Sequence, residues 1–133
     1  MIAFDTNAII RVLTEDDAAQ AKKVQRIIQS AEKNGHRILI LSEVVIETVW
    51  VLESVYRCTK EEVALLIDNL LTASAFYLPD ATAMRKAIKE FKKGGDFADH
   101  LIVSQAKHHQ AEKLFSFDQK LQNRFPDFVT ENI

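Results

Sequence analysis

Acidic side chains follow directly after two short apolar runs in this sequence. Asp5 comes after Ile2-Ala3-Phe4, and Asp118 comes after Leu114-Phe115-Ser116-Phe117. Runs of this kind are typical of buried strands. In open α/β sheets, ligands and substrates bind beyond the carboxyl ends of the strands. We therefore expect both carboxylates to lie at the functional edge of a sheet.

Two further pairs of acids have helical spacing. Glu43 and Glu47 are four residues apart, and Asp96 and Asp99 are three apart, so each pair shares one face of a helix. Glu47 and Asp99 have apolar neighbours, among which an unpaired carboxylate is expensive, and this favours a functional role for both. Glu43 is better explained as an ordinary first-turn acid. His100, beside Asp99, stays open as a further member of the site.

A cluster of carboxylates is unfavourable by itself because like charges raise one another's pKa. No Lys or Arg is adjacent in the sequence to Asp5, Glu47 or Asp99, although Lys120 is near Asp118. Helix dipoles offset part of the repulsion. A divalent cation offsets the rest, and Mg²⁺ or Mn²⁺ held by a few carboxylates is a typical phosphodiester-cleaving centre. We therefore expect a site for one of these cations.

Three polar residues accompany the acids. Thr6 and Asn7 follow the first aspartate, and Ser116 lies two residues before the last one. Their hydroxyl and amide groups can orient a carboxylate or a water. Asp5 and Asp96 have an alternative interpretation, since aspartate is also a favoured N-cap of helices.

The elements expected to position these groups alternate along the chain. Strands are predicted at 2–4, 38–41, 75–78 and 114–117, with a fifth, at an edge, over 128–130. Helices are predicted at 6–13, 16–33, 42–56, 60–71, 81–93 and 96–109. Ser42, Thr59 and Asp80 are expected to cap the helices that follow them. Apolar strands separated by helices predict a parallel sheet covered on both faces.

The helix expected at 42–56 is apolar on nearly all sides and contains Trp50. Such a helix is either buried completely or divided between the core and an interface, and both interpretations stay open.

The length of 133 residues suits one domain, and we expect residues 1–133 to form it. The single cysteine, Cys58, excludes a disulfide within the chain. The apolar start is interrupted at Asp5, unlike a signal peptide, and no apolar stretch reaches the ~18 residues of a membrane span. We therefore expect a cytoplasmic protein that is not embedded in a membrane.

The formal net charge is −2, which by itself argues against a simple basic nucleic-acid-binding protein. However, five of the 19 acids belong to the candidate site, and setting them aside leaves 14 acids against 17 bases. The rest of the molecule is therefore mildly basic. The candidates to hold a phosphate backbone are Lys22, Lys23, Arg26, Arg85, Lys86, Lys89, Lys92 and Lys93.

Four motifs in this order resemble the PIN-domain family, and within it the VapC-type toxins. They are Phe4-Asp5-Thr6-Asn7, the segment Ser42 to Leu52 with Glu47, Asp96-Phe97-Ala98-Asp99, and Phe115-Ser116-Phe117-Asp118. The resemblance implies a three-layer α/β/α sandwich with a central, mostly parallel sheet. It also implies cleavage of RNA with Mg²⁺ or Mn²⁺.

The same resemblance assigns roles by position. It gives Asp5, Glu47, Asp99 and Asp118 as the catalytic, metal-binding set, and Asp96 as an auxiliary metal ligand. Thr6 or Asn7, and Ser116, occupy supporting polar positions, and Ser116 stands where many relatives carry threonine. Glu43 does not fall on the motif. The resemblance further implies a homodimer silenced by a cognate antitoxin protein, with contacts to the third and fourth helices.

The sequence thus favours a metal-dependent endoribonuclease in which a metal-activated water attacks the RNA phosphodiester. Aspartyl-phosphate transfer of the haloacid-dehalogenase kind needs a second aspartate two residues after the first, where this chain has Asn7. A receiver domain needs an acid pair near the first strand, where this chain has Asp5 alone. No glycine-rich loop for a nucleotide exists. The remaining alternative is a catalytically silent PIN-like scaffold that binds RNA or a protein.

Overall fold

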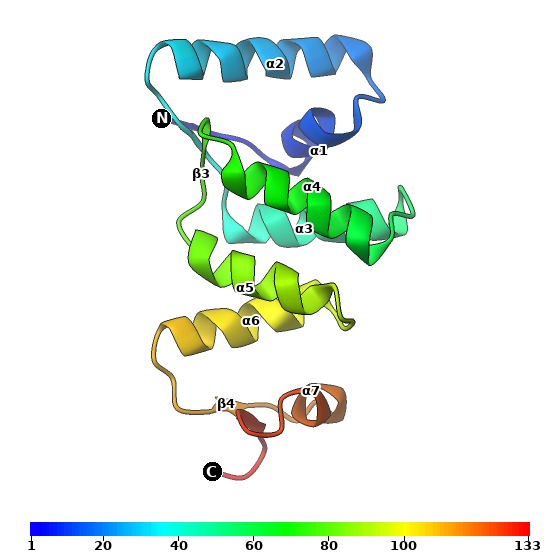
Figure 1. The fold of residues 1–133 in the computed structure, drawn as a ribbon, viewed down its shortest axis with the longest axis vertical. Helices are drawn as coiled ribbons and strands as arrows, with labels where there is room; N and C mark the ends of the chain where they lie inside the picture. The colour runs from blue at the N-terminus through cyan, green and yellow to red at the C-terminus, as the bar shows by residue number, and fades with distance from the viewer. The chain divides into compact units, whose positions relative to one another are not determined.

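Short strands alternate with helices in the computed structural model, which describes residues 1–133 (Figure 1). The elements are β1 Ile2–Ala3, α1 Thr6–Thr14, α2 Ala18–Lys33, β2 Ile38–Leu39, α3 Ser42–Ser54, α4 Lys60–Thr72, β3 Phe76–Tyr77, α5 Ala81–Phe91, α6 Phe97–His108, β4 Leu114–Phe115, α7 Gln119–Arg124 and β5 Val129–Thr130. They form two units, Met1–Ala81 and Thr82–Ile133, and each unit is described by itself below.

The first unit contains a parallel sheet in the order β1-β2-β3. Ile2 pairs with Ile38, which in turn pairs with Phe76. The backbone N–H of Phe4 continues the pairing beyond β1 by donating to the carbonyl oxygen of Leu39 at 3.0 Å. The parallel pairing confirms the sequence prediction. It brings the carboxyl ends of β1 and β2, and hence the starts of α1 and α3, to the same edge of this sheet.

The helices of this unit bury one face each. α1 packs against α2 and α3, and α3 packs against α4. Ile9, Ile38, Leu52 and Ile67 are completely buried in the resulting core. α4 begins with a capping box, in which Thr59 and Glu62 satisfy each other's backbone N–H groups. The predicted Thr59 cap is thereby confirmed.

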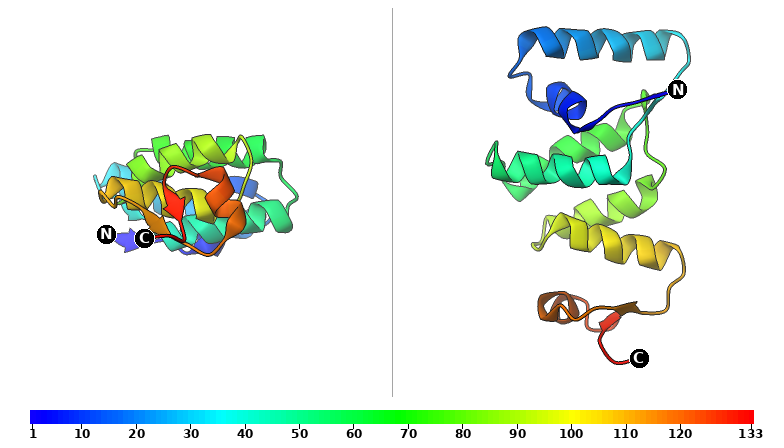
Figure 2. Two further views of the ribbon diagram at one scale, coloured as in Figure 1. Left: turned by 90° about the horizontal axis from the view of Figure 1, so that it is seen from below. Right: turned by 180° about the vertical axis from the view of Figure 1, so that it is seen from behind.

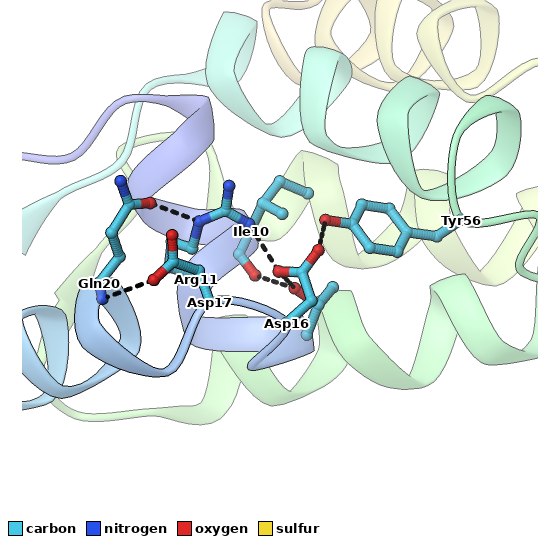
Figure 3. A network of polar contacts seen from close by, with 7 residues as sticks. Ile10, Arg11, Asp16, Asp17, Gln20 and Tyr56 are labelled. Carbon is cyan, nitrogen blue, oxygen red and sulfur yellow. Dashed lines mark hydrogen bonds and ion pairs between the residues drawn. The ribbon is translucent and has the colours of Figure 1, made fainter.

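A polar network ties the end of α1 to the segment after α3 (Figure 3). The Asp16 carboxylate accepts hydrogen bonds from the Arg11 guanidinium and the Tyr56 hydroxyl, both at 2.6 Å. Thr14 adds a third bond, at 3.0 Å. The hydrogen bond from Tyr56 is the largest cause of a lowered pKa of Asp16, and the Arg11 charge contributes to it. The network therefore fixes α1 relative to α3 at the ends remote from Asp5.

The second unit combines helices α5 to α7 with a two-stranded parallel sheet of β4 and β5. Leu114 pairs with Val129 in that sheet. α5 and α6 lie side by side (Figures 1 and 2), joined by a hydrogen bond of 2.8 Å from the Ser104 hydroxyl to the Ala83 carbonyl oxygen. The rings of Phe91 and Phe97 pack edge to face at 5.9 Å.

Four sequence expectations on local structure were wrong. α7 forms where no helix was expected. The N-cap of α3 is Leu41, without a side-chain hydrogen bond, and the Ser42 hydroxyl instead donates to Asp80 at 3.0 Å. Of the two interpretations of the apolar α3, complete burial was the wrong one, because Trp50 is 63% exposed. The residues of β1 are exposed, and only Phe4 after them is buried.

None of the helices combines the length and the apolar character that crossing a membrane requires.

Candidate active site

Asp5 occupies the N-cap position of α1, directly after β1. Its Oδ1 accepts a hydrogen bond of 2.9 Å from the backbone N–H of Ala8. The side chain is exposed, and the cap uses only one of its oxygens, so Oδ2 is available to a ligand. Thr6 is buried and Asn7 is exposed, so of these two supporting residues only Asn7 presents its side chain to solvent.

Glu47 lies on α3, the helix that follows the strand next to β1. Its side chain is exposed, whereas the next residue, Thr48, is completely buried and donates to the Val44 carbonyl oxygen. Glu47 is therefore not an unfavourably buried carboxylate among apolar neighbours, and that expectation was wrong. Its place in the candidate site stays a prediction, supported by the topology that brings α1 and α3 to one sheet edge.

Asp96 and Asp99 share the first turn of α6. Asp96 is the N-cap, and its Oδ2 accepts a hydrogen bond of 3.2 Å from the backbone N–H of Asp99. Both acids line a pocket of about 720 Å³. The other residues of this pocket, which we call the acidic pocket, are Gly95, Lys120, Leu121, Asn123 and Arg124. Acids of α6 and bases of α7 therefore face the same space.

The pKa of Asp99 is raised above its ordinary value. Burial of the half-buried carboxyl group is the largest cause, and the negative charges of Asp96 and then Asp118 add to it, whereas His100 acts in the opposite direction. The three acids of the second unit are thus close enough to influence one another. A raised pKa caused by burial and by neighbouring carboxylates is a common feature of functional sites.

Asp118 lies at the N-cap of α7, just after β4. Its Oδ1 accepts a hydrogen bond of 3.1 Å from the backbone N–H of Leu121. The Ser116 hydroxyl accepts a bond of 3.0 Å from the backbone N–H of Asp118, and Gln122 donates to the Ser116 carbonyl oxygen at 2.9 Å. Ser116 therefore holds the turn that orients Asp118.

His100 is packed into the wall of the second unit. Its Nε2 lies 2.7 Å from the carbonyl oxygen of Gly94, which makes Nε2 the donor, and its ring meets Phe125 edge to face at 5.5 Å. Gly95 has φ +92°, and a Cβ there would lie 2.8 Å from both His100 Nε2 and Arg124 Nε. The glycine is needed for this close approach as well as for its backbone conformation.

The expected metal ligands are distributed over both units. Asp96, Asp99 and Asp118 are brought together in the second unit, and Asp5 and Glu47 belong to the first. Neither unit by itself contains a group of three or more His, Cys, Asp or Glu side chains arranged to hold a metal. The complete ligand set therefore stays a prediction.

Sequence reasoning missed the contribution of α7 to the acidic pocket. Asn123 and Arg124 line it because α7 turns them toward the side where α6 begins. A usable signal was present, since Asp118 is a good N-cap residue and the segment 119–124 consists of residues that tolerate a helix.

The family model of the PIN domain matches residues 2–125 of this chain. The chain therefore belongs to the PIN-domain family, and the α/β class with parallel strands predicted from the sequence is confirmed. It is similar to a protein of Aquifex aeolicus (strain VF5) named VapC ribonuclease. The two are 24% identical over 121 residues, which is 90% of this chain and 89% of the relative.

Proposed function

We propose that this protein is a metal-dependent endoribonuclease and the toxin of a toxin–antitoxin pair. The observation that carries the proposal is the acidic pocket, in which Asp96 and the half-buried Asp99 lie opposite Lys120 and Arg124. Carboxylates can hold a cation there while the bases meet a phosphate. Membership of the PIN-domain family and the similarity to a VapC ribonuclease support RNA as the substrate.

The donor set fits a hard divalent cation. The ion pairs of the molecule are Arg11–Asp16, Lys60–Glu53 and Lys93–Glu90, so none of the candidate ligands is neutralised by a base. Their oxygen atoms are the ligands that Mg²⁺ and Mn²⁺ prefer. The residues that would hold the cation are Asp5, Glu47, Asp96, Asp99 and Asp118. When bound, the cation would supply Lewis-acid chemistry that activates water and stabilises charge on the phosphate.

In this proposal, the protein's own residues bind the cation and orient the carboxylates that hold it. Asp5, Glu47 and Asp99 would hold the cation directly, and Asp118 would hold it through water or help with a second one. Asp5 and Asp118 each accept a hydrogen bond from a backbone N–H group through one carboxylate oxygen. This bond fixes the carboxylate and so directs its other oxygen. Asn7 beside Asp5 and Ser116 beside Asp118 support these orientations. No side chain needs to act as nucleophile.

The proposal treats residues 1–133 as one nuclease domain in the cytoplasm, where its RNA substrate is found. A cognate antitoxin and a second copy of the chain are the proposed protein partners. Three large apolar side chains of the first unit, Trp50, Val55 and Leu65, are each 63% exposed and offer a contact surface on and beside α3 and α4.

The second candidate function is a scaffold that binds RNA or a protein without cutting. The exposed apolar side chains Trp50, Val55 and Leu65 suit it, because an exposed apolar surface is typical of a partner contact. Stabilisation by Mn²⁺ separates the two candidates, because a bound cation raises the melting temperature of the state that binds it. The nuclease requires this stabilisation and its loss in Asp99→Asn, whereas a scaffold without a metal site would show neither.

Cleavage of a mixed pool of structured RNAs tests the function itself. Wild-type protein is incubated with Mn²⁺ or with EDTA, and Asp5→Asn is incubated with Mn²⁺. We expect discrete cuts only for the wild type with Mn²⁺. Equal cleavage in EDTA, or by Asp5→Asn, would refute the assignment.

A further inference from the structure

A second pocket of the second unit, about 590 Å³ in volume, is lined mainly by bases. We call it the basic groove. Its cationic and imidazole side chains come from three helices: Lys86 and Lys89 from α5, His100, Lys107 and His108 from α6, and Arg124 from the end of α7. The helical spacing of three on α5 puts its two lysines on one face, so both can reach one ligand.

The bases of the basic groove outnumber its acids, since its lining contains three lysines and one arginine against one glutamate. The one acid in its lining, Glu90, lies 3.5 Å from Lys93, which is outside the groove. Lys86, Lys89 and Arg124 take part in none of the ion pairs of the molecule. Like charges gathered in one concave surface repel one another, and an anionic ligand removes that repulsion.

The wall of the basic groove contains a polar atom without a partner. His100 lines the groove, is only 4% exposed, and has its Nε2 occupied by the Gly94 carbonyl oxygen, while its Nδ1 has no hydrogen-bond partner. Buried polar atoms of this kind are rare in proteins and call for an explanation. Because Nε2 carries the proton, Nδ1 needs a hydrogen-bond donor, which a water or a ribose hydroxyl of RNA supplies and a phosphate oxygen does not.

Arg124 joins the basic groove to the acidic pocket, because its side chain lines both. The missing side chain of Gly95 makes this possible, since a Cβ there would lie 2.8 Å from Arg124 Nε. A linear polyanion that lies in the basic groove therefore passes Arg124 on its way to Asp96 and Asp99. This continuity favours a nucleic-acid strand over an unrelated anionic ligand.

We propose that the basic groove binds the phosphate backbone of the RNA strand next to the bond that is cut. The inference rests on the proposed ribonuclease function and adds where the substrate lies. Lys86, Lys89 and Lys107 hold successive phosphates, and Arg124 holds the phosphate at the junction with the acidic pocket. Substrates must then extend beyond the cut on the side that enters the groove.

The test measures binding of a fluorescent single-stranded RNA in EDTA, so that neither a metal nor cleavage is needed. Lys86→Gln/Lys107→Gln is compared with wild type and with Lys33→Gln/Arg57→Gln, two exposed bases of the first unit whose loss is the same change in charge. The logarithm of the RNA-binding constant falls linearly with the logarithm of the salt concentration, and each lost phosphate contact makes this slope shallower by about 0.7. For the groove variant, we expect a slope that is shallower by about 1.4 and an affinity for RNA that is about tenfold lower. The control should have the slope and the affinity of the wild type.

Three results would overturn the inference. One is a groove variant with the affinity and salt dependence of the wild type, and another is an equal loss in the Lys33→Gln/Arg57→Gln control. The third is displacement of the RNA by polyglutamate of equal charge at equal concentration, which would indicate an acidic protein as the occupant. A failed ribonuclease function looks different, because RNA would then bind in a groove-dependent way without being cut by the wild type in Mn²⁺.

Discussion

The backbone N–H of Asp99 donates a hydrogen bond to Oδ2 of Asp96 at 3.2 Å, which holds both carboxyl groups in one helical turn. Asp96 and Asp118 are both causes of the raised pKa of Asp99, after burial. The ionised Asp99 carboxylate is therefore repelled by its neighbours at the acidic pocket. Removing its charge should lower this repulsion and stabilise the second unit.

Asp99→Asn should stabilise the metal-free protein at pH 7. A carboxyl group whose pKa is raised in the folded state contributes stability below its unfolded value, ordinarily 3.8, and loses it as pH rises through the folded value. Urea unfolding in EDTA should give a higher free energy of unfolding for the variant than for the wild type at pH 7. This difference should become smaller toward pH 4. A wild type that is the more stable of the two at pH 7 would show that Asp99 is not under this strain. Glu43→Gln, an exposed acid of α3, serves as the control.

Asparagine and alanine should have different effects at Asp5. The carboxylate caps α1, so Asp5→Ala should cost about 0.5–2 kcal/mol of stability, whereas asparagine caps almost as well. Both variants should lose cleavage, because both lose the charge. Thermal unfolding and an RNA cleavage assay measure the two effects separately.

Asp17 provides the matched control for Asp5. It caps α2 in the same manner, accepting a bond of 3.0 Å from the backbone N–H of Gln20, but lies outside the candidate site. Its alanine and asparagine variants should repeat the stability pattern and keep full cleavage. Loss of cleavage in Asp17→Asn would mean that cleavage depends on intact helix caps in general and not on the Asp5 carboxylate in particular.

Gly95→Ala should destabilise the protein more than Gly35→Ala. Both glycines have positive φ, +92° and +69°, so alanine is strained at either position by about 1–2 kcal/mol. Only at Gly95 would the added Cβ also meet His100 and Arg124 at 2.8 Å, whereas nothing lies within 4 Å at Gly35. Chemical denaturation should show the larger loss for Gly95→Ala, and equal losses would contradict the close packing at the acidic pocket.

Tyr56→Phe should lower stability in a manner that depends on pH. The Tyr56 hydroxyl donates to Asp16 and is the main cause of the lowered Asp16 pKa. A lowered folded pKa gives stability that is present above the unfolded value and is lost as pH falls through the folded value. The difference between variant and wild type in urea unfolding should therefore be largest near pH 7 and smaller near pH 3. A pH-independent difference would assign the loss to packing instead.

The sequence was sufficient for the parallel pairing and for the order of the elements other than α7. Runs such as 38–41 lack polar alternation, and Thr59 with Glu62 at the start of α4 is a recognisable capping box. These features are local, so no tertiary partner had to be known. The same holds for Asp96, whose capping role was one of its two interpretations from the outset.

A local signal was present for α7, whereas the errors at Ser42 and in α3 concern residues whose partners are distant in the sequence. Ser42 is a good N-cap by type, but Asp80 lies close enough to take its hydroxyl, and the cap position shifts to Leu41. Apolar composition suggested a buried α3, yet which face is covered depends on its neighbours α1 and α4, and Trp50 lies outside their contact. The joining of two pockets by Arg124 likewise depends on Gly95 and cannot be read from either residue type alone.

Single-turnover cleavage by wild type and Asp99→Asn tests the central claim most directly. An RNA that the wild type cuts is followed over time at saturating Mn²⁺, with both proteins shown to be folded. The account predicts a loss of at least about 100-fold in the variant, the size expected when a charge-stabilising group of a catalytic centre is removed. A rate in Asp99→Asn within about threefold of the wild type, well short of that loss, would contradict a metal centre built around the acidic pocket.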